Sequence, residues 1–95
     1  MKVFVIGSVS QEDIIKNVAS DYLSSECEVR YVSRQPSVDR ETLIWKAFTN
    51  IMWADLVVAV SKPDGSFGDG TKYEMIFAMF NAKTVIIQPF DKYNA

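Results

Sequence analysis

The 95-residue sequence predicts an α/β protein, a Rossmann-like or flavodoxin-like three-layer sandwich on a four-stranded parallel sheet of strand order 2-1-3-4. Two observations predict this fold. Short runs rich in β-branched residues alternate with longer segments whose apolar residues recur at helical spacing. Residues 55–60 (DLVVAV) are apolar at nearly every position, as in parallel strands that helices cover on both faces. Since crossovers between parallel strands are right-handed, few arrangements remain, and the length allows one domain over residues 1–95.

The first strand and the first helix are predicted over residues 2–25. Residues 2–6 form a short apolar run rich in β-branched residues, and Gly7-Ser8 marks the turn that closes it. Ser10 is expected to cap the helix that follows, with Asp13 three residues later in the capping-box position. Apolar residues then recur at helical spacing until about residue 25.

The second strand and the second helix follow in the same pattern. Residues 28–32 predict a strand, and residues 33–37, which contain Pro36, predict a loop. Asp39 is expected to cap the second helix. The apolar residues of this helix form one wide stripe that can cover a sheet: Leu43, Ile44, Ala47, Phe48, Ile51 and Met52.

The last part of the chain contains the third and fourth strands. Residues 55–60 predict the third strand, and residues 61–70, with three glycines and a proline, predict the longest loop. The third helix is expected from about Thr71 to Asn81. Residues 84–88 predict the fourth strand, which a proline and a short polar tail follow.

The strand order also predicts where a ligand binds. In the order 2-1-3-4 the chain reverses its direction of progress between the first and third strands. Ligands of open α/β sheets bind at such a switch point, beyond the carboxyl ends of the strands. The loops at this point are residues 7–10 and 61–70, so the segment GDGTKYE (residues 68–74) lies at the predicted site.

This segment has two interpretations. Thr71 as N-cap with Glu74 three residues later would form a capping box and stabilise the helix by about 1 kcal/mol. Alternatively, Glu74 is a reactive carboxylate, the glycines let a sugar or phosphate approach the backbone, and the helix N-terminus attracts an anionic ligand. Asp69 or Asp64 could then supply a second carboxylate, and paired carboxylates suit the cleavage of a glycosidic bond.

The composition excludes several classes of function. The chain has no histidine, which excludes His metal sites and Ser-His-Asp triads, and its single cysteine, Cys27, excludes a disulfide framework. A net charge of −2 argues against a surface for nucleic acid, and no apolar run is long enough for a membrane span. We expect a cytoplasmic protein with a small-molecule ligand and without a metal or other cofactor.

The third predicted helix is apolar on nearly all sides, from Tyr73 to Phe80. Such a helix is buried on more than one side. One side can face the sheet and the other a second subunit, so we expect a homodimer or a higher homo-oligomer. The alternative is a local hydrophobic cluster within the monomer.

The same residues carry a resemblance to a known family. The run 54–60, the glycine-rich loop after it, and Gly70-Thr71-x-x-Glu74 with its apolar helix resemble nucleoside 2-deoxyribosyltransferases. They also resemble the related 2′-deoxynucleoside 5′-monophosphate N-glycosidases. Residues 3–8 are similar to the first strand and ligand loop of this group. The resemblance covers most of the chain in order, and its specific part is the Gly-Thr-x-x-Glu block with the preceding strand.

The resemblance implies a function and a set of site residues. Glu74 would be the nucleophile that attacks C1′ of the sugar and forms a covalent glycosyl-enzyme, which another base or water then resolves. Asp69 would be the second carboxylate, and residues of a neighbouring subunit would complete the site. Substrate contacts would come from Gly7 and Ser8 on the base side, from Gly70 and Thr71 along the sugar or its 5′ group, and from Asp64, Ser66 and Gly68.

Departures from the pattern keep three alternatives open. Gly68 stands where an aspartate usually precedes the Gly-Thr pair, and Ala47 stands where transferases commonly carry an aspartate. These differences favour a protein that binds a nucleotide without cleaving it. Residues 68–74 also resemble the Gly-x-Gly-Thr-x-x-Glu segment of phosphoribohydrolases of the lysine-decarboxylase-like type. In a purely structural subunit, Glu74 would only cap its helix.

Overall fold

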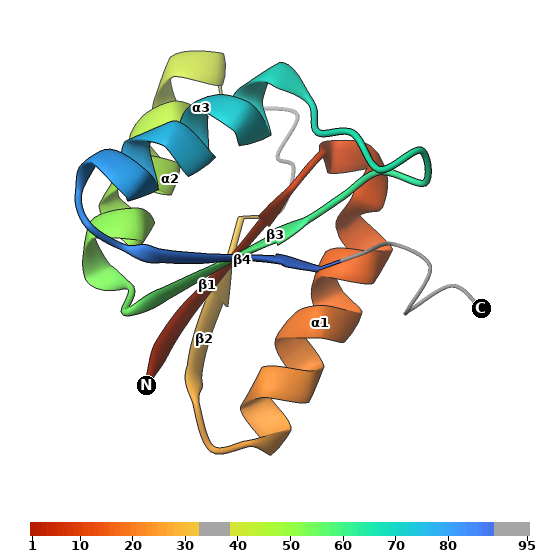
Figure 1. Cartoon of the computed structure of the whole chain (residues 1–95), viewed down its shortest axis with the longest axis vertical. Coiled ribbons are helices and arrows are strands. Elements are labelled where there is room, and N and C mark those ends of the chain that lie inside the picture. Colours follow the sequence, from red (N-terminus) through yellow and green to blue (C-terminus); the bar gives the residue numbers. More distant parts are fainter. Residues whose placement is uncertain (33–38, 89–95) are drawn as a thin grey trace.

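The computed structural model of the chain describes residues 1–32 and 39–88. The four strands are parallel and lie in the order β2-β1-β3-β4, which confirms the predicted fold class and strand order. Helix α1 covers one face of the sheet, and α2 and α3 cover the other (Figure 1). The loop predicted over 33–37 and the tail after the last strand lie outside the described residues. In chain order the elements are β1 (Lys2–Gly7), the 3-10 helix η1 (Val9–Gln11), α1 (Glu12–Ser24), β2 (Glu28–Tyr31), α2 (Arg40–Trp53), β3 (Leu56–Val60), α3 (Asp69–Phe80) and β4 (Thr84–Gln88).

The core consists of two clusters, one on each face of the sheet. Successive side chains of a strand point to opposite faces, so Val3 and Val5 of β1 pack toward α1, while Phe4 and Ile6 pack toward α2 and α3. All five residues of β3 are buried, which confirms the prediction from its apolar run. Full burial of one such side chain contributes about 1.5–3 kcal/mol. The two central strands therefore form a firm support for the loops at their carboxyl ends.

The first helix begins later than predicted. A turn of 3-10 helix comes first, in which the Gln11 N–H donates to the Ser8 carbonyl at 2.8 Å. α1 then starts at Glu12, and no side chain caps it. The predictions that Ser10 is the N-cap and that Asp13 closes a capping box are therefore wrong. The Ser10 hydroxyl instead lies 3.1 Å from the Ser8 hydroxyl.

The third helix begins earlier than predicted, and this changes the role of Glu74. Gly68 occupies the N-cap position in an extended conformation, and α3 starts at Asp69. Thr71 therefore lies inside the helix and does not cap it. The predicted capping box between Thr71 and Glu74 is wrong, because no side chain forms a capping hydrogen bond at this end. The interpretation of Glu74 as a residue that only caps its helix is therefore not supported.

Asp39 caps the second helix as predicted. Its carboxylate accepts a hydrogen bond from the Thr42 N–H at 2.7 Å, and this bond lowers the pKa of Asp39. Asp55, expected to open the third strand, lies just before it, where its carboxylate accepts from the Lys2 N–H at 2.9 Å. In residues 1–32 and 39–88, no helix has the length and apolar character needed to cross a bilayer.

Candidate active site

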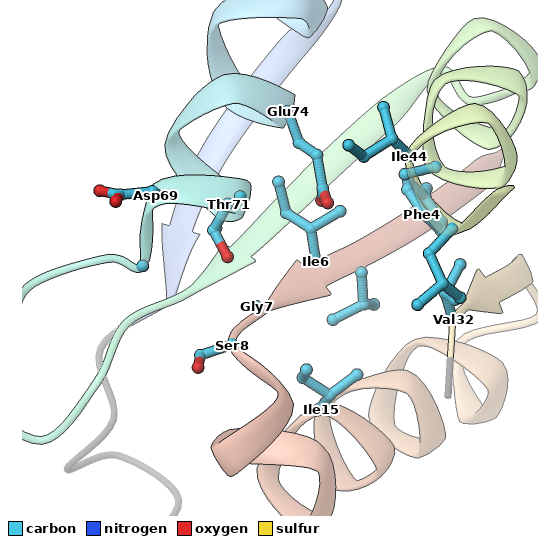
Figure 2. Close-up of a pocket in the computed structure, with 15 residues that line it drawn as sticks. Phe4, Ile6, Gly7, Ser8, Ile15, Val32, Ile44, Asp69, Thr71 and Glu74 are labelled. Atoms are coloured by element: carbon cyan, nitrogen blue, oxygen red, sulfur yellow. The ribbon is translucent and has the colours of Figure 1, made fainter. Parts of the chain in front are cut away.

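A cavity of about 420 Å³ opens at the carboxyl end of β1, beside the start of α3 and the first half of α2 (Figure 2). Its position is the switch point predicted from the strand order, and its volume is in the range of small-molecule sites. Its polar side consists of Gly7 and Ser8 at the carboxyl end of β1 and of residues from α3 and its N-cap. The side chains on the opposite side are apolar. The cavity is lined by Phe4, Val5, Ile6, Gly7, Ser8, Ile15, Val32, Leu43, Ile44, Ala47, Gly68, Asp69, Gly70, Thr71 and Glu74.

Glu74 is the central polar group of this cavity. Its side chain extends from the second turn of α3, and its carboxyl group points into the cavity toward Ile6 (Figure 2). Burial raises the pKa of Glu74 to about 7, because the surrounding apolar groups do not solvate the charged form. Within the described part of the chain, no hydrogen bond or ion pair engages this carboxyl group. Glu74 is thus available to a ligand and is not committed to the fold.

Thr71 lies one turn before Glu74 on the same helix. Its side chain is 3% exposed and lines the cavity, and its hydroxyl points toward the end of β1 (Figure 2). No partner among the described residues accepts or donates a hydrogen bond to this hydroxyl. Among the described residues no fully buried polar side-chain atom lacks a partner, so the Thr71 hydroxyl is open to the cavity. The arrangement therefore leaves room for a ligand atom to complete the hydrogen bonding of Thr71.

The three glycines of the site differ in what their small size achieves. A Cβ at Gly7 would come within 3.0 Å of the Ile15 Cδ1 and 3.3 Å of the Val60 carbonyl, so this glycine allows β1 to pack closely. A Cβ at Gly70 would meet nothing within 4 Å, and Gly70 has no positive φ. Gly68 also has an ordinary φ of −67°. Packing thus explains Gly7, whereas Gly70 leaves open space next to Glu74.

The second carboxylates expected from the sequence do not join Glu74. Asp69 borders the cavity, but its carboxylate points away from Glu74 into solvent (Figure 2). Asp64 and Ser66 do not line the cavity. The Asp64 carboxylate accepts bonds from the Ser66 N–H at 3.0 Å and the Ser66 hydroxyl at 2.6 Å, which lower the pKa of Asp64. The structure therefore brings Glu74 together with Thr71 and Ser8, whereas the Asp69 carboxylate points away from them and Asp64 and Ser66 lie outside the cavity.

The apolar side of the cavity is the part that the sequence reasoning missed. It is formed by alternate residues of β1, the residue after β2 and the first half of α2, namely Phe4, Ile6, Val32, Leu43, Ile44 and Ala47. The apolar stripe of α2 was interpreted only as a cover for the sheet. The stripe begins at Leu43, one helical turn before Ala47, which is the first residue of α2 that packs in the core. The apolar residues of this extra turn are the signal that could have indicated an apolar wall of a binding site.

Two solved structures have a fold similar to that of this chain. The structure resembles a CMP N-glycosidase from Clostridium botulinum, with a TM-score of 0.72 and 20% identity over 99% of this chain and 73% of that one. It also resembles a 2-deoxyribosyltransferase from Leishmania mexicana, with a TM-score of 0.75 and 16% identity over 99% of this chain and 71% of that one. No protein-family model and no curated protein sequence matches. The fold expected from the sequence resemblance is confirmed: the chain has the fold of a nucleotide N-glycosidase and of a deoxyribosyltransferase.

Proposed function

We propose that residues 1–95 form a domain that binds a nucleoside or nucleotide in this cavity and cleaves or transfers its N-glycosidic bond through Glu74. The observation that carries this proposal is the Glu74 carboxyl group, which points into a cavity at the switch point and has no partner in the described chain. An acid that is partly shielded from water and has no structural partner is unfavourable for folding, which favours a role in chemistry. The likeness to enzymes that act on such bonds supports the same assignment.

The proposed reaction has two displacement steps. The ionised Glu74 attacks C1′ of the sugar, the electron pair of the C1′–N bond leaves with the base, and the base takes a proton from solvent. The product is an ester between Glu74 and C1′. Water or the nitrogen of a second base then attacks C1′, loses its proton to solvent, and frees the carboxylate. Water gives hydrolysis, and a second base gives transfer.

The two sides of the cavity suggest the orientation of the substrate. The apolar side, with Phe4, Ile44 and Ala47, suits the faces of a purine or pyrimidine. The polar side holds the Ser8 hydroxyl, the Thr71 hydroxyl and the N-terminus of α3, and these groups suit the 5′ end of the sugar. Ser8 thus lies beside Thr71, and in this orientation it contacts the 5′ end, although the resemblance implied the base side.

A 5′-phosphate is favoured by one further contact. The Lys62 ammonium group lies beside the N-cap of α3, 3.8 Å from where a Cβ of Gly68 would be. A cation beside free helical N–H groups forms a suitable environment for an anion, and the first residues of α3 line the cavity. We therefore infer that the 5′-monophosphate binds more tightly than the free nucleoside.

A second candidate function is binding without cleavage. The observation that favours it is the direction of Asp69, whose carboxylate does not face Glu74, so that no described carboxylate is placed to assist the leaving base. A nucleotide could then occupy the cavity and remain intact. Both functions require that the nucleotide binds, but only the first releases a free base.

The test is chromatography for free base after incubation with ribo- and deoxynucleosides and their 5′-monophosphates. We expect base release from at least one of them and none with Glu74→Gln, which keeps the size of the side chain but is not a nucleophile. Intact-mass analysis with a slow 2′-fluoro analogue should show a glycosyl adduct on the native chain alone. Tight binding with no base release from any compound would establish the second candidate and refute the first.

A further inference from the structure

A closed turn in the loop between β3 and α3 carries Lys62. Residues 62–65 form a β-turn with a proline at the second position, in which the Gly65 N–H donates to the Lys62 carbonyl at 2.9 Å. Gly65 has a φ of +83°, a conformation that favours glycine. The Lys62 N–H in turn donates to the Ser66 carbonyl at 2.8 Å. Backbone hydrogen bonds therefore close the turn on both sides, and Lys62 lies at its base.

The Lys62 ammonium group lies beside the polar side of the cavity. Its Nζ is 3.8 Å from where a Cβ of Gly68 would be, and the Cβ of Ser8 is 4.0 Å from the same point. Lys62 and Ser8 thus flank the N-cap of α3. The helical hydrogen bonds of α3 begin with the Lys72 N–H, which donates to the Gly68 carbonyl at 3.0 Å. The N–H groups before it are available to an anion at this end of the helix.

The carboxylate nearest to Lys62 in the sequence does not neutralise it. Oδ1 of Asp64 accepts hydrogen bonds from both the N–H and the hydroxyl of Ser66. These two bonds are the main causes that lower the pKa of Asp64, and the charge of Lys62 is the smallest cause. Among residues 1–32 and 39–88, no ion pair engages the Lys62 ammonium group. Its positive charge is therefore available to a ligand.

We propose that Asp64 and Ser66 are positioning residues, which hold Lys62 in place for the 5′-phosphate of a nucleotide and so make the site select nucleotides over nucleosides. Neither residue lines the cavity. They act through the turn, because the bonds between them keep the Asp64 carboxylate from pairing with Lys62 and keep the turn closed. This inference rests on the orientation of the substrate in the proposed function, and it does not depend on cleavage of the substrate.

Two substitutions at Asp64 separate positioning from a plain effect of charge. Asp64→Ala and Asp64→Asn remove the same negative charge, and this loss by itself would tighten the binding of an anion. Only Asp64→Asn keeps an oxygen that can accept the two bonds from Ser66. We therefore expect Asp64→Ala to raise the Kd of a 5′-monophosphate about fivefold, whereas Asp64→Asn binds it at least as tightly as the native chain. Ser66→Ala, which loses only the hydroxyl, should have a smaller effect than Asp64→Ala.

Titrations of the nitrogen-15-labelled chain measure these affinities through the amide resonances of Gly70 and Thr71. The ligands are deoxyadenosine, deoxycytidine, their 5′-monophosphates and inorganic phosphate. The quantity compared is the Kd of a nucleoside divided by the Kd of its 5′-monophosphate. Lys62→Met should lower this ratio about tenfold, the usual effect of losing one charge-assisted hydrogen bond. Asp64→Ala should lower it about fivefold in the native chain but cause no further loss in Lys62→Met, because it acts through Lys62.

Several outcomes would overturn the proposal. They are a ratio that Asp64→Ala leaves unchanged, an equal loss in Asp64→Ala and Asp64→Asn, a further loss when Asp64→Ala is added to Lys62→Met, or no binding of any of the five ligands. Base release by the same samples decides on the proposed function separately. Nucleotides that bind with the expected ratios but keep their base would refute cleavage and support the positioning role. Base release with the same kcat/KM for nucleosides and 5′-monophosphates would support the enzyme and refute the positioning role.

Discussion

Asp69 and Glu74 lie on the same helix, but their carboxylates point in different directions (Figure 2). Five positions along an α-helix turn the side chain by about 140°, so the helix itself separates them. The structure therefore predicts that Asp69→Asn changes base release by less than about twofold, whereas Glu74→Gln reduces it by at least about a hundredfold. Initial rates by chromatography measure both. A loss of equal size in Asp69→Asn would show that Asp69 turns inward when substrate binds.

Glu74 should also limit stability in a way that depends on pH. Its pKa is 4.5 in an unperturbed chain and about 7 in the fold, so the folded state binds more protons between these values. The contribution of Glu74 to stability is then greatest below pH 4.5 and is lost as the pH rises from there through 7, by about 3 kcal/mol at most. Glu74→Gln, which resembles the protonated form, should exceed the native chain in stability at pH 8 and match it near pH 4. Urea unfolding at the two values measures the difference.

The elements that the sequence predicted well are those fixed by local patterns. The apolar run of β3 and the Asp39 cap of α2 depend on residues within a few positions, and both are confirmed. The starts of α1 and α3 were wrong, because Ser10 and Thr71 have side chains that can cap a helix but lie where the chain has already turned. A capping residue is recognised by its backbone conformation, which a short sequence pattern does not contain.

The position of the candidate site could be predicted from the strand order, but the directions of its side chains could not. The strand order placed Glu74 and Thr71 at the switch point, because topology alone determines where the carboxyl ends of β1 and β3 lie. The sequence could not show that Asp69 points outward or that Asp64 bonds to Ser66, since these directions depend on the first residue of α3 and on the turn before it.

The raised pKa of Glu74 predicts the pH dependence of the reaction. A nucleophilic carboxylate must be ionised, and the free protein loses this proton near pH 7. kcat/KM should therefore rise about tenfold per pH unit below 7 and level off above it, since this parameter reports the free enzyme. Rates across a set of buffers at constant ionic strength measure the profile. A rate that falls as the pH rises through 7 would indicate that Glu74 acts as a proton donor.

A substitution at Thr71 can test for contact with the ligand without a large effect on the stability of the fold. Thr71 is a buried residue, but its hydroxyl opens onto the cavity and has no partner in the described chain, so Thr71→Val should leave the melting temperature nearly unchanged. If the hydroxyl binds the sugar or its 5′ group, the Kd of the ligand should rise about tenfold, the usual effect of losing one hydrogen bond. Titration calorimetry with the best-bound nucleotide measures this value. Unchanged affinity would exclude Thr71 from the binding site.

Gly70 should show a conflict between stability and function. Its φ is not positive and a Cβ there would meet nothing within 4 Å, so Gly70→Ala should stabilise α3 by about 0.5 kcal/mol. The added methyl group would occupy the space next to Glu74, so the KM for the substrate should rise severalfold. Ser20→Ala, at an exposed position of α1, is the control, because it also favours a helix but lies on the other face of the sheet. Thermal unfolding and KM separate the two effects. If Gly70→Ala changed only stability, as Ser20→Ala should, then the glycine would not be needed for the approach of a ligand.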